Sequence, residues 1–254
     1  MAGQAVSSGV VAVRAAAVIA AAALAAGCVA RQGRRDSAAG TTQAGATMQS
    51  PQTGQGATGE WRSLVSADAW RGYKESALPS GWHVMNGELM KEGTVNDIVT
   101  RDQFGDFELE FDWKVAPRGN AGVFYRGTEE YEKIYWSAPE YQLLDDAGHA
   151  DAKDRRTAAA ANYALDPSPA GLAKPAGEWN SGRIVVRGAH VEHWLNGQKA
   201  VEYELWSPKW EAEVKASKFV DWKNYGRARR GHIAIQGDHE GALSLRNIRI
   251  REIS

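Results

Sequence analysis

The sequence predicts an all-β fold in which two antiparallel sheets pack as a sandwich, most simply a jelly roll. The first observation is Phe107–Val115, which alternates apolar and polar residues over its whole length, as a strand with one buried face does. The second is the pair of dipeptides Asn86-Gly87 and Asn196-Gly197, which are strong hairpin-turn signals. The third is that no long segment shows a convincing helical period of 3.6 residues.

The remaining strands follow from short β-type runs between turn residues. The two hairpins occupy Trp82–Met90 and His193–Val201, and further strands are predicted at Asp97–Thr100, Gly122–Arg126, Tyr141–Leu144, Gly182–Arg187, Val191–Leu195, Val201–Leu205, His232–Gln236 and Ala242–Arg251. About ten or more antiparallel strands with short turns favour two packed sheets. The predicted inner faces carry Phe107, Leu109, Phe111, Trp113, Val123, Leu143, Ile184, Val186, Ile233, Ile235, Leu243 and Leu245. The Ala-rich stretch 150–161 is predicted to be a short helix or an ordered loop.

Composition divides the chain and excludes some classes of function. All 10 Trp, 8 Tyr and 5 Phe lie at or after Trp61, so residues 61–254 are predicted to form one large domain. With 30 Lys+Arg against 31 Asp+Glu, the net charge of −1 argues against nucleic acid as a partner. The sequence has no Gly-rich phosphate loop, GxSxG, HExxH or CxxC motif. The many Trp rings would suit both a core and a sugar-binding surface.

The first 60 residues predict targeting rather than a fold. Arg14 precedes an apolar run that ends at Cys28, the only cysteine, and the run is too short to span a bilayer. Leu24–Cys28 resembles a bacterial lipoprotein cleavage site, although its Leu lies one place further from the cysteine than usual. We therefore predict a signal peptide over 1–28 with lipidation at Cys28, and a disordered tether over 29–60. An ordinary secretory signal cleaved nearby is the alternative.

The chemistry-bearing residues concentrate around the strand at Tyr141–Leu144. Glu140 and Gln142 share one face of this strand, and Asp145, Asp146 and His149 follow it in a loop. Carboxylates and an imidazole that converge at a strand end could bind a divalent metal or transfer protons. A solvated acidic surface loop is the alternative interpretation.

A second acidic pattern lies on the strand Phe107–Val115. Glu108, Glu110 and Asp112 alternate along one face, as carboxylates do in glycosidases that hold the scissile bond between them. A solvent-facing strand whose charges are matched by cations is the alternative, and we favour it for Glu108. Asp112, close to Asn120-Ala121-Gly122, is the better site candidate. His239 resembles His149 in having an aspartate beside or near it in a loop.

An ordered set of motifs resembles one bacterial family. These motifs are NDIVTRDQFGDFELEFDWKV, GNAGVFYRG, EYQLLDDAGH, GEWNSGRIVVRG, VEHWLNGQKAVEYE and GHIAIQGDHEGALSLRNIRIRE. They resemble the 3-keto-disaccharide (3-keto-glycoside) hydrolase domain from Trp61 to Glu252. The resemblance implies a concanavalin A-like lectin/glucanase jelly-roll sandwich of two antiparallel sheets, and an enzyme secreted or attached as a lipoprotein in the cell envelope, in the periplasm or on the outer membrane. Departures from the family pattern include Ala121 in place of a serine and the inserted Glu240.

The resemblance also implies a carbohydrate substrate already oxidised at C3. The ketone acidifies the C2–H, so a base can remove that proton, the C1 substituent can leave by elimination, and water can add back. We expect Glu140, Asp146 and His149 to transfer protons or to bind a divalent metal ion, for which they are the candidate ligands. The substrate-binding candidates are Asp112, Asn120, Arg126, Gln142, Asp145 and His239, with Arg126 holding the oxidised sugar or its oxyanion.

Two other classes of function remain open at this point. A non-catalytic, lectin-like carbohydrate-binding module would need exposed aromatic rings but no proton-transfer geometry. A glucanase-like hydrolase of unoxidised sugars would need two of Glu108, Glu110 and Asp112 in a cleft, with their carboxyl groups about 5–9 Å apart.

Overall fold

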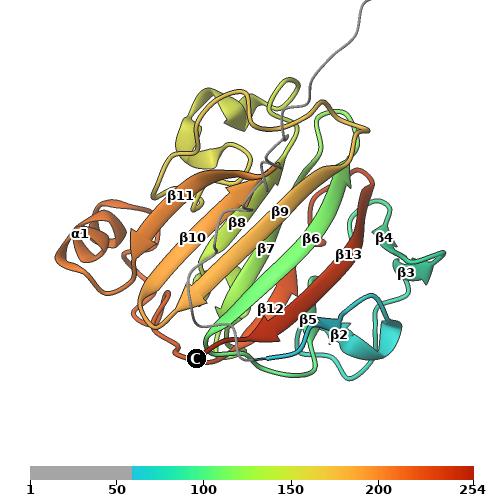
Figure 1. The fold of residues 1–254 in the computed structure, drawn as a ribbon, viewed down its shortest axis with the longest axis horizontal. Helices are drawn as coiled ribbons and strands as arrows, with labels where there is room; N and C mark the ends of the chain where they lie inside the picture. The colour runs from blue at the N-terminus through green and yellow to red at the C-terminus, as the bar shows by residue number, and fades with distance from the viewer. Residues whose placement is uncertain (1–58) are drawn as a thin grey trace, which may run out of the picture. The chain divides into compact units, whose positions relative to one another are not determined.

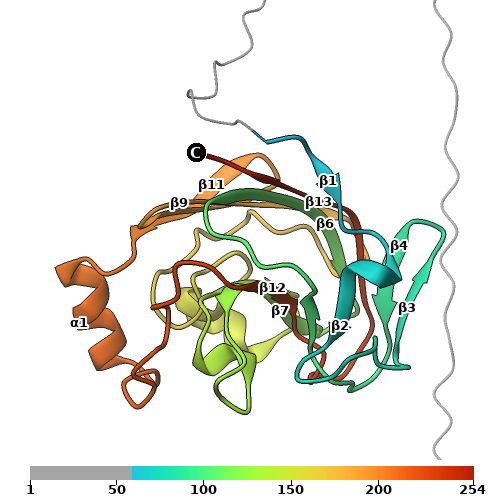
Figure 2. The same cartoon turned by 90° about the horizontal axis from the view of Figure 1, so that it is seen from below.

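The structure is a computed structural model that describes residues 59–254. Two antiparallel sheets form separate layers, seen face-on in Figure 1 and edge-on in Figure 2, which confirms the predicted all-β sandwich. Cys28, the predicted signal peptide and the predicted tether up to residue 58 lie outside the described residues. Within residues 59–254, no helix is long and apolar enough to cross a membrane.

The larger sheet has eight strands in the order β11-β10-β9-β6-β13-β4-β3, with β1 paired to β13. Its strands are β1 (Arg62–Ser63), β3 (Trp82–Met85), β4 (Glu88–Lys91), β6 (Phe107–Val115), β9 (Asn180–Arg187), β10 (His190–Leu195), β11 (Gln198–Glu204) and β13 (Leu243–Glu252). Both predicted hairpins are confirmed, because β3 pairs with β4 and β10 pairs with β11. In each turn the Asn and the Gly both have positive φ, as a two-residue type I′ turn requires.

The smaller sheet has five strands in the order β2-β5-β12-β7-β8. Its strands are β2 (Trp70–Gly72), β5 (Ile98–Thr100), β7 (Asn120–Gly127), β8 (Glu140–Leu144) and β12 (His232–Ile235). The side chains of β7 and β8 alternate between two environments. Tyr141 and Leu143 join the main core between the sheets, and Phe124 joins a second apolar cluster on the opposite, outer face. Glu140 and Gln142 alternate with Tyr141 and Leu143 along β8, so their side chains lie on that outer face.

The core confirms the predicted inner faces. All twelve apolar residues predicted for them belong to the main buried cluster between the two sheets. Trp70, Trp113 and Trp210 are among its largest fully buried side chains, so part of the high Trp content serves the core. Each buried Val, Leu, Ile or Phe contributes about 1.5–3 kcal/mol through its removal from water.

The sequence prediction missed one helix. α1 (Pro208–Ala216) begins after Ser207, whose side chain accepts a hydrogen bond from Trp210 N, with Pro208 in the first turn. The helix buries only Trp210 and Val214, one turn apart, so its apolar period is too short to stand out. Residues 150–161, expected as a short helix or loop, contain the 3₁₀ turns Ala150–Lys153 and Arg155–Thr157. Two further 3₁₀ turns lie at Ala67–Ala69 and Ile134–Trp136.

Candidate active site

A cavity of about 200 Å³ lies on the outer face of the smaller sheet and gathers polar side chains from six segments of the chain. It is lined by Asn120, Tyr135, Glu140, Gln142, Tyr163, Lys218, Phe219, Gln236, Asp238 and His239. Strands β7 and β8 supply its floor, and the loop after β12 supplies one wall. The segment that follows α1 supplies Lys218 and Phe219. Four of the predicted site residues, Asn120, Glu140, Gln142 and His239, are brought together here.

Glu140 is the buried acid of this cavity. Its side chain lies against the bare backbone of Gly122 on the neighbouring strand, at a place where any Cβ would overlap the carboxylate. Glu140 is only 6% exposed, and burial raises its pKa to about 8, while the ammonium of Lys218 opposes part of this rise. A carboxyl group with a pKa near neutrality can both accept and return a proton.

The amide of Gln142 connects Glu140 with Asn120. In one amide orientation Nε2 donates to Asn120 Oδ1 over 3.2 Å. In the swapped orientation Nε2 donates to Glu140 Oε1 over 2.9 Å and to the backbone oxygen of Ala121 over 3.2 Å. The swapped orientation satisfies the buried carboxylate of Glu140 without neutralising it.

The backbone beside β8 is fixed by an extended loop. Ala160 N donates to Gln142 O over 2.8 Å, and Tyr163 N donates to Glu140 O over 3.1 Å. These bonds continue the smaller sheet beyond its last strand. They also place the Tyr163 ring at the cavity, where Lys218 Nζ lies 4.2 Å from the ring centroid.

Two buried oxygens in this cavity have no hydrogen-bond partner among the described residues. They are Gln236 Oε1 and Asp238 Oδ1. The other carboxylate oxygen of Asp238 forms an ion pair of 3.4 Å with Lys133. Buried polar atoms are almost always hydrogen-bonded, so both oxygens need a hydrogen-bond donor, such as a water molecule or a hydroxyl group of a ligand.

Lys218 and His239 are the nitrogen bases of the cavity. Burial lowers the pKa of Lys218, while Glu140 and Asp151 oppose that change. Burial also lowers the pKa of His239; nearby Asp238 opposes this, and the positive charge of Lys91 adds to it. His239 is therefore uncharged at neutral pH and can accept a proton.

Asp112 and Arg126, two of the predicted substrate-binding residues, do not lie in the cavity. Asp112 belongs to β6 in the other sheet, where its Oδ2 binds Asn247 and Arg246. Arg126 has a φ of 53° at the β-bulge between β7 and β12, and the bulge redirects its side chain. It is buried against Asp106 and donates to the backbone oxygens of Gly105 and Gly188.

Asp145, Asp146 and His149 build the loop after β8 rather than the cavity. Asp145 accepts from the backbone N–H of Arg118 over 2.8 Å, and Asp146 accepts from that of Ala159 over 2.8 Å. Asp146 also pairs with Arg155 over 3.0 Å. His149 uses Nδ1 to accept from the N–H of Asp151 and lines an open hollow of about 430 Å³ together with Asp146. His149 also helps to lower the pKa of His239.

This arrangement does not bring the three candidate metal ligands, Glu140, Asp146 and His149, into one group. Among residues 59–254, the group of His, Asp and Glu side chains whose ligand atoms lie within 4.8 Å of one another is His190, Glu192 and Glu202, on the far sheet. There Lys199 Nζ binds Glu192 over 2.7 Å and Glu202 over 3.0 Å, so an ammonium already supplies the positive charge. Glu140, Asp146 and His149 form no such group in the described part of the chain.

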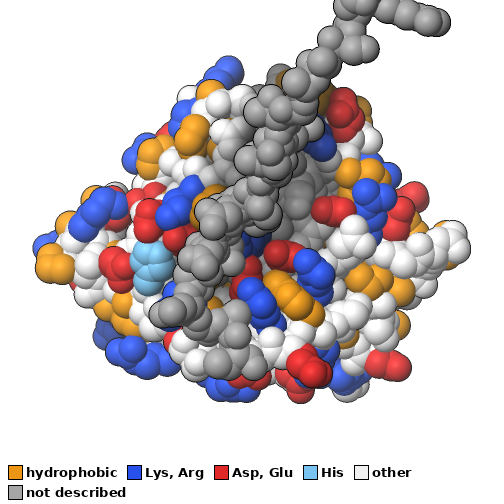
Figure 3. Space-filling view, viewed as in Figure 1, with side chains coloured by type: hydrophobic (Ala, Val, Ile, Leu, Met, Phe, Trp, Pro, Cys, Tyr) orange, Lys and Arg blue, Asp and Glu red, His pale blue; other side chains and the backbone are white. Residues whose placement is uncertain are grey.

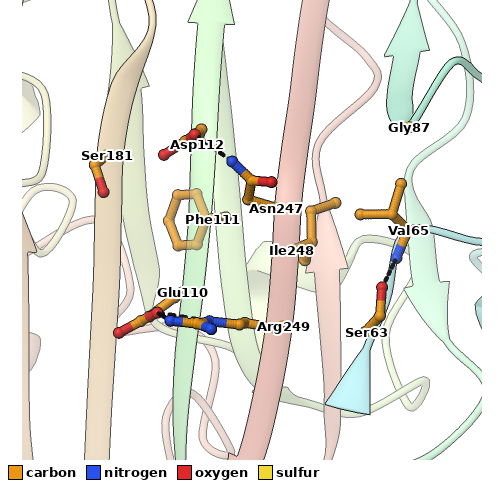
Figure 4. A pocket seen from close by; sticks show the side chains of 10 residues that line it. All are labelled: Ser63, Val65, Gly87, Glu110, Phe111, Asp112, Ser181, Asn247, Ile248 and Arg249. Carbon is orange, nitrogen blue, oxygen red and sulfur yellow. Dashed lines mark hydrogen bonds and ion pairs between the residues drawn. The ribbon is translucent and has the colours of Figure 1, made fainter. Parts of the chain in front are cut away.

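The acidic face of β6 is matched by cations, as favoured for Glu108. Glu108 and Glu110 pair with Arg251 and Arg249 of β13. Figure 3 views this outer face of the larger sheet and shows acidic and basic side chains side by side. The hollow of about 670 Å³ drawn in Figure 4 lies here, at the bulge of β13, with Glu110 directed at Arg249 and Asp112 at Asn247. Carboxylates held in this way are poor general acids or bases.

The family that this fold and cavity belong to is decided by sequence similarity. A profile described as the 3-keto-alpha-glucoside-1,2-lyase-like domain matches residues 60–251. The chain belongs to this family. The expected resemblance is thereby confirmed, and so is the prediction of a carbohydrate-active enzyme of the glycoside hydrolase or lyase class.

Individual relatives agree with this family. A curated 3-keto-disaccharide hydrolase of Bacteroides thetaiotaomicron is 35% identical over 216 residues, 72% of this chain and 74% of that protein. A provisionally assigned glycosyl hydrolase from Parabacteroides distasonis has a crystal structure with a TM-score of 0.71 and 27% identity, covering 76% of this chain and 94% of that one. A galectin-like protein of unknown function from Bacillus subtilis shares the fold alone, with a TM-score of 0.50 and 13% identity over 76% and 93% of the two chains.

Several cavity residues of this family member were missed from the sequence. Gln236 and Asp238 stand in the recognised motif beside His239, and alternation beyond β12 could have pointed to Gln236. Lys218 had no such signal, because it follows a helix that the sequence did not reveal. Tyr135 and Tyr163 lie in irregular segments whose path depends on tertiary contacts.

Proposed function

We propose that the cavity binds a glycoside whose sugar carries a ketone at C3 and cleaves its glycosidic bond by elimination followed by hydration. The observation that carries this proposal is that Glu140 and Lys218 line one cavity. One is a buried carboxyl group with a pKa of about 8, and the other is an exposed ammonium at the same cavity. A base and a cation at one site suit a reaction that removes a C–H proton and develops charge on a carbonyl oxygen.

Each residue then has a role that its surroundings support. Ionised Glu140 takes the C2 proton, and the Lys218 ammonium stabilises the negative charge that develops on the C3 oxygen. The C1–O bond breaks, the departing oxygen takes the proton from Glu140, and a C1=C2 double bond remains. Water adds to C1 as neutral His239 accepts a proton from it, and His239 then returns that solvent-derived proton to C2. The net result is hydrolysis.

The unpartnered oxygens of Gln236 and Asp238 would hold the sugar in this reaction. Sugar hydroxyl groups donate hydrogen bonds, and both oxygens need donors. Asn120 and Gln142 add amide groups from the floor of the cavity. The name of the relative from Bacteroides thetaiotaomicron supports a 3-keto-disaccharide as the natural substrate class.

The test is a comparison of two substrates that differ only at C3. The purified protein is incubated with methyl 3-keto-glucoside and with methyl glucoside, and the sugars are separated after incubation. Release of 3-keto-glucose from the first alone is expected, with one solvent deuteron incorporated at C2 when the reaction runs in D₂O. Release of glucose from the second would favour a glucanase-like enzyme. Binding of either glycoside without turnover would favour a lectin-like module.

We also propose that the enzyme is anchored in the cell envelope through Cys28. The support is sequence alone, namely the apolar run after Arg14 that ends at the single cysteine. Fractionation of cells that express the wild-type protein and Cys28→Ser tests this proposal. The wild-type protein should sediment with membranes and the variant should not. Equal membrane association of both would exclude the anchor.

A further inference from the structure

The loop between β12 and β13 carries three of the cavity residues, Gln236, Asp238 and His239. It crosses from the smaller sheet to the larger one. Neither Asp238 nor His239 is part of a strand, so the direction of each side chain depends on what fixes the loop backbone. Two buried charged residues outside the cavity contact that backbone.

Lys91 contacts the far half of this loop. It is the last residue of β4 and only 1% exposed. Its Nζ donates to His239 O over 2.6 Å, to Gly241 O over 3.3 Å and to Gly93 O over 2.9 Å. The ammonium has three protons, so all of them are directed at backbone oxygens.

Asp97 contacts the near half. It precedes β5, is 2% exposed, and accepts from Gly237 N over 2.8 Å. The N–H of Asp238 also hydrogen-bonds to its carboxylate, which opposes the rise in pKa, to about 6, that burial causes. The backbone is closely packed here, because a Cβ on Gly237 would lie 2.6 Å from Asn96 O. Only glycine fits at that position.

The two charges therefore hold the loop from opposite sides. The anion receives N–H groups at residues 237 and 238, and the cation binds carbonyl groups at residues 239 and 241. No ion pair joins Lys91 directly to Asp97 among the ion pairs of the described residues, so the peptide groups between them satisfy both. Buried charges contribute little to stability compared with apolar residues of similar size, and their best-attested benefit is to select a single conformation.

We propose that Lys91 and Asp97 are positioning residues that fix the backbone of residues 237–241, so that Asp238 and His239 stay directed into the cavity. The consequence for catalysis rests on the function proposed above. The fixed backbone does not, and it can be measured without any substrate.

The first measurement is amide hydrogen exchange of Gly237 and Asp238 in the full chain. Lys91→Met keeps a long apolar side chain but loses all three donors. Asp97→Asn keeps the shape and one acceptor oxygen but loses the charge. Both should speed exchange in the loop by about 10-fold or more, while amides of β6 and β9 stay protected. Unchanged loop exchange in both variants would overturn the proposal.

The control is Glu108→Gln, which removes a buried carboxylate charge from the outer face of the larger sheet. Glu108 is 4% exposed and ion-paired, comparable in burial to Asp97. Its replacement should leave loop exchange unchanged. A general loosening of the fold would instead speed loop exchange in all three variants.

The second measurement is a double-mutant cycle on turnover of methyl 3-keto-glucoside. Lys91→Met should lower kcat by about 10–100-fold with a smaller change in KM, as loss of orientation does. In a His239→Ala background the same substitution should have a smaller further effect, because one of the two side chains that it positions is gone. Independent, multiplicative effects would overturn the positioning role. If the variants exchange the loop amides faster but the wild-type protein has no activity on 3-keto-glycosides, Lys91 and Asp97 still fix the loop backbone and the proposed function is refuted.

Discussion

Strands β6 and β8 both carry glutamates on an outward-facing side, yet their carboxyl groups have opposite fates. On β6, Glu108 and Glu110 are directly opposite Arg251 and Arg249 of β13 in the strand register. On β8, Glu140 is opposite Phe124 of β7. The first two glutamates are neutralised by arginines, and the third is enclosed with a pKa of about 8.

The difference shows that the residues of the paired strand determine whether a glutamate is held in an ion pair or can transfer protons. Arginines at the paired register positions of β13 form ion pairs with the row of carboxylates on β6. These ion pairs remove the repulsion between the carboxylates and also make them poor proton acceptors. On β7 the corresponding outward positions are Gly122 and Phe124, which offer space and an apolar wall but no charge. The carboxyl group that lacks a cation at its own register is the one that can exchange protons.

The largest expected effect comes from exchanging carboxylate for amide on each strand. Glu140→Gln should lower kcat on a 3-keto-glycoside by about 10²–10⁴-fold, the usual contribution of a general base. Glu108→Gln is the matched control, because it removes a buried carboxylate charge from the larger sheet. Steady-state kinetics should show wild-type turnover for the control. Equal losses in both variants would erase the distinction between the two strands.

The space beside Glu140 should matter almost as much as its charge. Gly122→Ala places a Cβ where the carboxylate lies, so Glu140 must move, and a displacement of about 1 Å at a reacting group costs about 10²-fold in rate. Gly105→Ala is the control, since the nearest atom to its Cβ, Arg229 O, is 3.4 Å away. The kcat of the control should stay at the wild-type value. A Gly122→Ala enzyme with normal kcat would show that the position of Glu140 is not critical.

Sequence alone predicted the sandwich because its strands can be recognised from patterns of neighbouring residues. The alternation in Phe107–Val115 and the two Asn-Gly turns are properties of neighbouring residues, and the structure has strands and hairpins at those places. Helix α1 escaped because two buried residues, Trp210 and Val214, make too short a pattern.

The candidate site was only partly predictable because it depends on which strands share a sheet. Glu140, Gln142 and Asn120 were recognised and lie together, since β7 and β8 are paired. Asp112 looked equivalent but belongs to the other sheet, and Arg126 is redirected by a bulge that its own residue type does not signal. Lys218 is 78 residues after Glu140 in the sequence and reaches it only through the excursion after α1.

A smaller effect is expected in the pH dependence of stability. Glu140 has an ordinary pKa of 4.5 and a folded pKa of about 8, so the folded state binds its proton more tightly. The stability that this proton contributes is complete below about pH 4.5 and is lost as pH rises towards 8. Glu140→Gln cannot ionise, so it should match wild type at pH 5 and exceed it in free energy of unfolding at pH 9.

Urea unfolding of the two proteins at both pH values measures this difference. Comparing the variant with wild type cancels the contribution of other buried groups, such as Asp97 and His193, whose pKa values are also shifted. A variant less stable than wild type at pH 9 would mean that ionised Glu140 is paired as well as the glutamates of β6 are.

The smallest effect should come from removing one of the ion pairs between β6 and β13. Arg249 is 50% exposed and pairs with Glu110, which is 31% exposed, and its guanidinium lies 4.5 Å from the centre of the Trp61 ring. Exposed ion pairs and cation–π contacts each contribute up to about 1 kcal/mol, so Arg249→Ala should lower the free energy of unfolding by at most about 2 kcal/mol. Because this face lies across the sandwich from Glu140, kcat and KM should not change. Thermal unfolding and steady-state kinetics on the same preparation check both statements. A large loss of turnover would instead show that the hollow of Figure 4 takes part in catalysis. It would also show that a carboxylate on a strand can transfer protons even when a cation is paired with it.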